Sequence, residues 1–172
     1  RNAITAKRLG HSYLFTGPEG VGKFHFALAL AKTLLCQCVG VSPVGEPVCQ
    51  SCRWVDQKNH PSLRILDVPE GKQSIPIDTI REIESEFALK PFMPGYRIFI
   101  FNNADKMESE AANALLKFLE EPVRDCIIIL VTAHPESILP TVISRCQTIH
   151  FYPLQQAAIE KFFRKHLNLT EA

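Results

Sequence analysis

The chain has 172 residues, of which 46% are hydrophobic and 22% charged, which fits a globular domain with a core and the start of a second domain. The formal net charge of +1 excludes a protein drawn to DNA or to anionic lipid by its overall field. No apolar run approaches the roughly 20 residues that a membrane-spanning helix needs.

The first residues of the sequence and the grouping of its cysteines indicate in which cellular compartment the protein is expected. Residues 1–9 contain neither an initiator Met nor an apolar secretory core, so we expect the chain to begin inside a longer protein. Without a secretory signal, clustered cysteines indicate metal ligands rather than disulfides. We therefore expect a cytoplasmic protein.

The first predicted elements form a unit that is typical of nucleotide-binding proteins. Residues 11–16 are a short apolar run that predicts a buried strand. A turn rich in glycine follows, and residues 23–35 then carry Ala, Leu and Phe at helical spacing. A strand, a glycine-rich loop and a helix in this order open many α/β nucleotide-binding folds.

The middle of the chain alternates between loops, helices and strands. The pattern predicts a loop over 37–47, a short helix over 53–57, a strand over 63–68 and an amphipathic helix over 77–89. On that last helix Ile77, Ile80, Ile83 and Phe87 share one face.

The second half continues this alternation. It predicts strands over 97–101, 126–132 and 148–151, and helices over 109–119 and 155–166. The strands are apolar on both faces, as expected of parallel strands that helices cover. The sequence therefore predicts an α/β fold: a three-layer sandwich with a parallel sheet.

The glycine-rich turn carries a phosphate-loop pattern that is incomplete. Gly17, Gly20, Gly22 and Lys23 stand where backbone N–H groups and a lysine hold phosphates. The next position should supply a Ser or Thr hydroxyl to Mg²⁺, but it is Phe24. Two interpretations remain: residual ATP or ADP binding, or a loop that is only a structural turn.

The acidic part of an ATPase site is also missing. A magnesium-binding pair should follow the buried strand over 97–101, but Asn102 and Asn103 stand there. Asp105, one turn further on, is predicted to be a helix-start residue rather than a substitute. Two independent losses at one site predict that the chain does not hydrolyse ATP.

Four of the six cysteines fall in one short stretch. Cys36-x-Cys38 and Cys49-x-x-Cys52 supply four soft ligands in two close pairs, which suits tetrahedral zinc. No general base stands beside them. The pattern predicts a structural zinc module at about residues 36–58.

Three longer motifs carry a resemblance to a known family. These are His11-Ser-Tyr-Leu-Phe-Thr-Gly-Pro, Asn113-Ala-Leu-Leu-Lys-Phe-Leu-Glu-Glu-Pro122 and Ser144-Arg145-Cys146. From about Leu9 to Phe151, the chain resembles the bacterial clamp-loader AAA+ subunits of DNA polymerase III. Its loss of catalytic residues is similar to the delta prime class of that family.

The resemblance implies an assembly and a role for one arginine. Family members form a ring with gamma/tau and delta subunits and load the sliding clamp onto primed DNA in replication. An arginine in the Ser-Arg-Cys motif reaches the ATP site of a neighbouring subunit, which implies that Arg145 is an arginine finger in trans. The alternative is that Arg145 pairs with a local carboxylate.

The resemblance also implies a zinc site, a nucleotide sensor and domain limits. Cys38 or Glu46 would replace the family's remaining cysteine ligand. Thr132 and His134 stand near the first sensor, which we expect to be lost because Ala133 takes its polar position. Residues 1–152 correspond to the AAA+ core, and residues 153–172 to the start of the helical lid.

Taken together, these features predict a non-hydrolysing clamp-loader subunit within the DNA polymerase III holoenzyme. An active ATPase of the gamma/tau type is the alternative, against which Phe24 and the two asparagines argue. A zinc-dependent interaction domain unrelated to replication is a third possibility, and the combination of motifs argues against it.

Overall fold

The computed structural model describes residues 9–37, 49–88 and 93–154, and its centre is one five-stranded sheet. All four strand pairings are parallel, and the strands lie in the order β2-β3-β4-β1-β5. The strands are β1 (Ser12–Thr16), β2 (Leu63–Leu66), β3 (Arg97–Phe101), β4 (Cys126–Thr132) and β5 (Gln147–His150).

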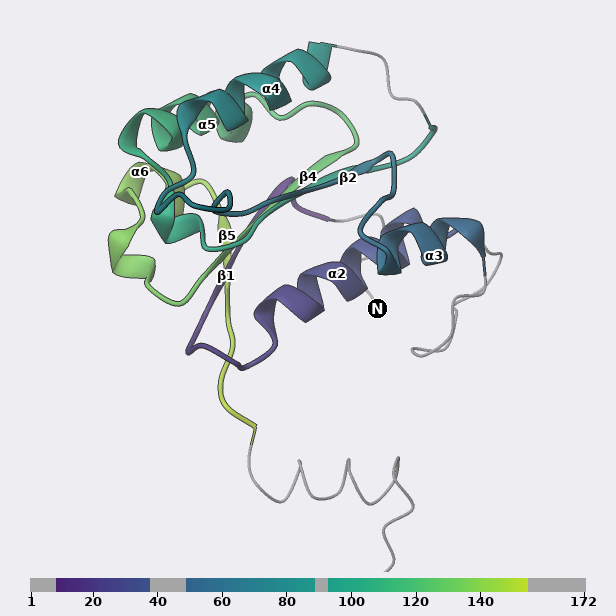
Figure 1. The fold of residues 1–172 in the computed structure, drawn as a ribbon, viewed down its shortest axis with the longest axis horizontal. Coiled ribbons are helices and arrows are strands. Elements are labelled where there is room, and N and C mark those ends of the chain that lie inside the picture. The colour runs from purple at the N-terminus through teal and green to yellow at the C-terminus, as the bar shows by residue number, and fades with distance from the viewer. Residues whose placement is uncertain (1–8, 38–48, 89–92, 155–172) are drawn as a thin grey trace, which may run out of the picture.

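Helices cover both faces of this sheet (Figure 1). On one face lie α2 (Lys23–Leu35) and α3 (Gln50–Asp56); on the other lie α4 (Ile77–Ala88), α5 (Ser109–Glu120) and α6 (Pro140–Ile143). Two buried apolar clusters fill the spaces between sheet and helices. The predicted α/β sandwich of three layers with a parallel sheet is therefore confirmed.

The interior strand β3 shows how alternation builds the two clusters. Ile98 and Ile100 belong to the cluster beneath α2, whereas Phe99 and Phe101 belong to the cluster beneath α4 and α5. All four side chains are at most 3% exposed. Burying each contributes about 1.5 to 3 kcal/mol, so this strand anchors both layers.

The predicted elements agree with the observed ones except in short segments. The bounds of α2, β3 and β4 are those predicted. Helix α3 begins at Gln50, three residues earlier than expected, because the sulfur of Cys49 accepts a hydrogen bond from the Cys52 N–H and caps the helix. Helix α6 and the 3₁₀ helices η1 (Ala104–Lys106) and η2 (Pro135–Ser137) were not predicted.

Several predictions concern residues outside the described ranges. They are the helix over 155–166 and most of the lid segment, the loop over 38–47 with Cys38 and Glu46, and the side chain of Phe87. Within the described ranges, no helix has the length and apolar character needed to cross a membrane.

Candidate functional site

A pocket of about 270 Å³ opens where β1, β3 and β4 end, at the start of α2. Ligands of open parallel sheets commonly bind at the carboxyl ends of the strands. The wall contains phosphate-loop residues, residues that follow β3, and the end of β4: Glu19, Gly20, Gly22, Lys23, Phe24, His25, Asn102, Asn103, Val131, Thr132 and Ala133.

The glycines of the phosphate loop are needed for its shape. Gly17 has a φ of 143°, and a Cβ there would lie 2.2 Å from the carbonyl oxygen of Phe151. That neighbour is fixed, because the Phe151 N–H donates to the Thr16 carbonyl at 2.7 Å. The turn from β1 into α2 therefore requires glycine whether or not a nucleotide binds.

Lys23, the loop lysine, bonds to its own loop. Its side chain is buried, and Nζ donates to the carbonyls of Gly17 at 2.6 Å and Pro18 at 2.7 Å. Burial lowers the pKa of Lys23, while the carboxylates of Glu19 and Asp105 act in the opposite direction. In this arrangement the lysine stabilises the turn.

Phe24 occupies the position where a magnesium ligand was expected. Its half-buried ring lies on the pocket wall, and the ammonium of Lys58 lies 5.4 Å from the ring centre. A cation over an aromatic face is a favourable contact. Lys58 follows α3, so this contact joins the segment after the cysteine cluster to the start of α2.

The two asparagines after β3 share one carboxylate. Asn102 Nδ2 donates to Asp67 Oδ2 at 2.7 Å, and Asn103 Nδ2 donates to Asp67 Oδ1 at 2.8 Å. Asp67 directly follows β2, the neighbour of β3 in the sheet. Sequence reasoning missed Asp67, although its place at the end of a neighbouring strand was a usable signal.

Asp105 and Thr132 also pair beside this pocket. Asp105 lies in the first turn of η1, as expected of a helix-start residue, but its carboxylate accepts a hydrogen bond from Thr132 Oγ1 at 2.5 Å. Thr132 Oγ1 in turn accepts from the His134 N–H at 2.8 Å. The His134 ring lies on the surface beside Glu136. The hydroxyl at the expected sensor position is thus bonded within the chain.

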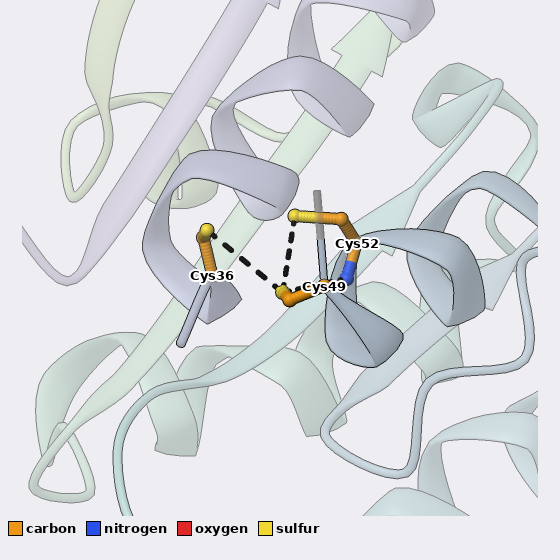
Figure 2. A group of neighbouring side chains, drawn as sticks. All are labelled: Cys36, Cys49 and Cys52. Carbon is orange, nitrogen blue, oxygen red and sulfur yellow. Dashed lines mark hydrogen bonds between the residues drawn. The ribbon is translucent and has the colours of Figure 1, made fainter. Parts of the chain in front are cut away.

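Three cysteines converge at the other end of α2 (Figure 2). Cys36 follows the helix, Cys49 caps α3, and Cys52 lies in the first turn of α3. The sulfur atoms of Cys36 and Cys49 are 4.0 Å apart, those of Cys49 and Cys52 are 3.5 Å apart, and all three lie within 4.8 Å of one another.

This donor set fits a zinc ion. Zn–S bonds of about 2.3 Å in a tetrahedron place the sulfur atoms about 3.8 Å apart, close to the spacing here. Burial, followed by hydrogen bonds with Cys36 and Cys49, raises the pKa of Cys52 to about 12, so binding a metal would release a proton. Cys38 and Glu46, the two candidates for the fourth ligand, lie outside the described residues.

A buried hydrogen-bond chain ties the cysteine segment to the sheet. His60 Nδ1 accepts from the Ser62 N–H at 3.0 Å, so the ring proton lies on Nε2, which donates to Ser51 Oγ at 2.8 Å. Ser51 Oγ donates to the Leu35 carbonyl at 2.6 Å. Burial lowers the pKa of His60, which favours this neutral form. His60 therefore has a structural role in these hydrogen bonds.

Arg145 lies just after α6, far along the chain from the phosphate loop. Its Nη2 is 2.8 Å from Glu120 Oε1, at the end of α5, and Nη1 donates to the Thr141 carbonyl at 2.9 Å. The side chain is 36% exposed. The local carboxylate partner that the alternative interpretation expected is therefore present, and the guanidinium still reaches solvent.

Comparison with known proteins matches the chain to one family of DNA polymerase III proteins. The family model described as "DNA polymerase III, delta subunit" matches residues 1–155. The chain belongs to this family. It is 42% identical over 159 residues to the Bacillus subtilis DNA polymerase III subunit delta', covering 92% of this chain and 47% of that protein.

Two further likenesses extend to other DNA polymerase III proteins. The B. subtilis DNA polymerase III subunit tau is 35% identical over 161 residues, which cover 92% of this chain and 28% of tau. A Thermotoga maritima gamma subunit-related protein superposes with a TM-score of 0.60 at 20% identity, covering 95% of this chain and 48% of that one. This likeness shows the fold alone. The chain spans less than half the length of these relatives.

Proposed function

We propose that this member of the DNA polymerase III delta-subunit family is a clamp-loader subunit that does not hydrolyse ATP. It helps to assemble the AAA+ ring that loads the sliding clamp onto primed DNA, and it works beside gamma/tau and delta subunits in the cytoplasm. The names of the delta' and tau relatives support this assembly.

The observation that carries the proposal is the state of the phosphate-loop pocket. Phe24 offers no oxygen to a metal, and Lys23 donates to the carbonyls of its own loop. Asn102 and Asn103 point their amide donors at Asp67. A hydrolytic site needs a metal-binding hydroxyl, acidic groups and a lysine turned toward phosphate. In this pocket Phe24 replaces the hydroxyl, two amides replace the acidic pair after β3, and the lysine ammonium is bonded within its own loop.

Arg145 supplies the catalytic contribution that we propose for this chain. A guanidinium is permanently charged and can stabilise charge on a transferring phosphoryl group. Arg145 lies at the surface, outside the pocket of its own chain. The group that it would reach therefore belongs to the ATP site of a neighbouring gamma/tau subunit.

We also propose that Cys36, Cys49 and Cys52 hold a structural zinc ion, with Cys38 as the fourth ligand and Glu46 as the alternative. The sulfur spacing supports this assignment, as does the packing of α3 on α2 through a Lys32–Asp56 ion pair of 2.7 Å. The ion would fasten the cysteine segment to the core rather than take part in chemistry.

The test is calorimetric titration of the zinc-loaded, nucleotide-free chain with ATP and ADP, with and without Mg²⁺, together with a phosphate-release assay. We expect no magnesium-dependent binding and no release. Tight magnesium-dependent binding with steady phosphate release would replace this proposal with an active ATPase of the gamma/tau type. In the assembled complex, Arg145→Ala should lower the turnover of the neighbouring site about 1,000-fold or more.

A further inference from the structure

The guanidinium of Arg145 is held at several points by its own chain. Besides the ion pair with Glu120 and the bond to the Thr141 carbonyl, Nη1 lies 3.4 Å from Ser144 Oγ. Such contacts select one orientation of a side chain that otherwise has many rotamers. A guanidinium has more N–H donors than these contacts use, so donors remain for a phosphate.

The backbone at Arg145 is also fixed. Its N–H donates to the Val142 carbonyl at 3.1 Å, and its carbonyl accepts from the buried hydroxyl of Ser12 at 2.7 Å. Ser12 begins β1, a strand in the interior of the sheet. Because the backbone cannot shift easily, the position of the charge depends mainly on the side-chain torsions.

Glu120 is the only partner among these contacts that carries a charge and comes from a distant part of the chain. It is the last residue of α5, and the neighbouring backbone is anchored, because Leu119 is buried and its carbonyl lies 3.2 Å from His11 Nε2. The Glu120 side chain is 50% exposed, so the pair lies at the surface.

We propose that Glu120 is a positioning residue for Arg145. Its carboxylate keeps the guanidinium in the orientation in which the remaining donors face a phosphate that a neighbouring nucleotide-bound subunit presents. This inference rests on the proposed function of Arg145 in trans. A pre-ordered arginine loses less freedom when it engages the transition state, and small misplacements of such a group are costly to the rate.

The experiment measures ATP turnover by the full-length protein assembled with its gamma/tau and delta partners. Glu120→Ala should lower kcat about two- to fivefold, the range that a surface ion pair gives, and leave KM for ATP unchanged. Glu120→Gln keeps an oxygen acceptor and should retain more activity than Ala. Glu121→Gln, which removes a charge one residue along, is the matched control and should leave kcat as it is.

A double-mutant cycle decides whether Glu120 acts through Arg145. The loss caused by Glu120→Ala should disappear in an Arg145→Ala background. An equal loss in both backgrounds would overturn the inference, as would an unchanged or raised kcat in Glu120→Ala alone. If Arg145→Ala itself has no effect, the proposed function fails first and this inference fails with it. Thermal unfolding of each variant separates these outcomes from lost folding.

Discussion

The two ends of α2 carry two groups of side chains that differ in whether their polar atoms are already bonded within the chain. At the C-terminal end, Cys36, Cys49 and Cys52 bring three sulfur atoms within 4.8 Å of one another, a spacing that an ion can use. At the N-terminal end, Lys23 and the asparagines beyond it are bonded to partners in the chain itself. The cysteine sulfurs at one end of α2 are therefore placed to bind an ion together. At the other end, the lysine and asparagine donors are already used in hydrogen bonds within the chain.

This difference shows why a motif alone does not define a site. Gly17 of the phosphate loop is required by the turn itself, since any Cβ there would collide with the Phe151 carbonyl. A loop can therefore keep its sequence after its chemistry is gone. The cap of α3 accounts for the approach of Cys49 to Cys52, but it does not account for Cys36, because thiols pack well without facing one another.

The largest expected effect comes from removing the metal that we propose. A chelator, or Cys49→Ser, should lower the unfolding temperature by about 10 °C, equivalent to roughly 3 to 5 kcal/mol for a domain of this size. Cys49→Ser would remove one of the proposed ligands and also change the group that caps α3. Differential scanning calorimetry with measured zinc content checks this.

The control for that experiment is Cys146→Ala, a thiol far from the cluster. It should keep one zinc per chain and, apart from its own packing cost, show the same fall in unfolding temperature on chelation as the unmodified protein. If the unmodified protein unfolds at the same temperature with and without chelator, the cysteine cluster does not hold a stabilising metal ion. The proposed difference between the two ends of α2 would then be wrong.

The next effect concerns the acidic pair of an ATPase. Asn102→Asp with Asn103→Glu should not restore hydrolysis and should destabilise the fold by about 3 kcal/mol at pH 7. Both new carboxylates would face Asp67, losing two hydrogen bonds to it, and residue 103 has a φ of 53°, which Asn tolerates better than Glu. Urea unfolding measures the loss.

A compensating change tests the cause of this loss. Adding Asp67→Asn should recover about half of the lost stability, because the like charges are then separated by an amide. Asn59→Asp, at an exposed position, is the control and should cost little. A double variant as stable as the unmodified protein would show that Asp67 does not restrict this site.

The fold could be predicted where short stretches of sequence have a clear pattern. The start of α2 follows from the glycines before it, and the bounds of β3 and β4 follow from continuous apolar runs. The start of α3 could not be predicted, because the capping group is the sulfur of Cys49, which is not a usual cap. Four-residue α6 is too short to show a helical period.

The site was harder to predict because its partners meet only in the folded chain. The sequence shows that Asn102 and Asn103 replace acidic residues, but not that Asp67, 35 and 36 residues earlier, binds both amides. The same holds for Glu120 and Arg145, which come together because α5 and α6 pack on the same face of the sheet. Residue types can be predicted from motifs, whereas partners across a sheet depend on strand order.

A smaller effect is expected from the buried histidine beneath the cysteine segment. His60→Leu leaves the Ser62 N–H without its acceptor and should cost about 2 kcal/mol. Because the pKa of His60 is lower in the folded chain, the unfolded chain binds the proton more readily. The stability supplied by neutral His60 is therefore complete above about pH 6.5 and falls as the pH decreases below that value.

Urea unfolding at pH 7.5 and 5.5 tests both parts of this prediction. The loss of stability on acidification should be smaller in His60→Leu than in the unmodified protein, while any contribution from the thiolates is common to both. The exposed His25 on α2 provides the control, since His25→Leu removes a histidine that is not buried. Identical pH dependence in His60→Leu would mean that the folded chain accommodates a protonated ring.

The smallest effect belongs to Lys23 and tests the comparison most directly. If the lysine now serves the turn, Lys23→Met should destabilise the fold by about 1 kcal/mol, because the Gly17 and Pro18 carbonyls lose a charged donor while burial of the charge is relieved. Urea unfolding beside the exposed control Lys106→Met measures it. A gain in stability would instead show that burying the ammonium destabilises the fold by more than its hydrogen bonds stabilise it. That result is expected of a lysine that serves a phosphate ligand, and it would indicate that the loop is still a binding site.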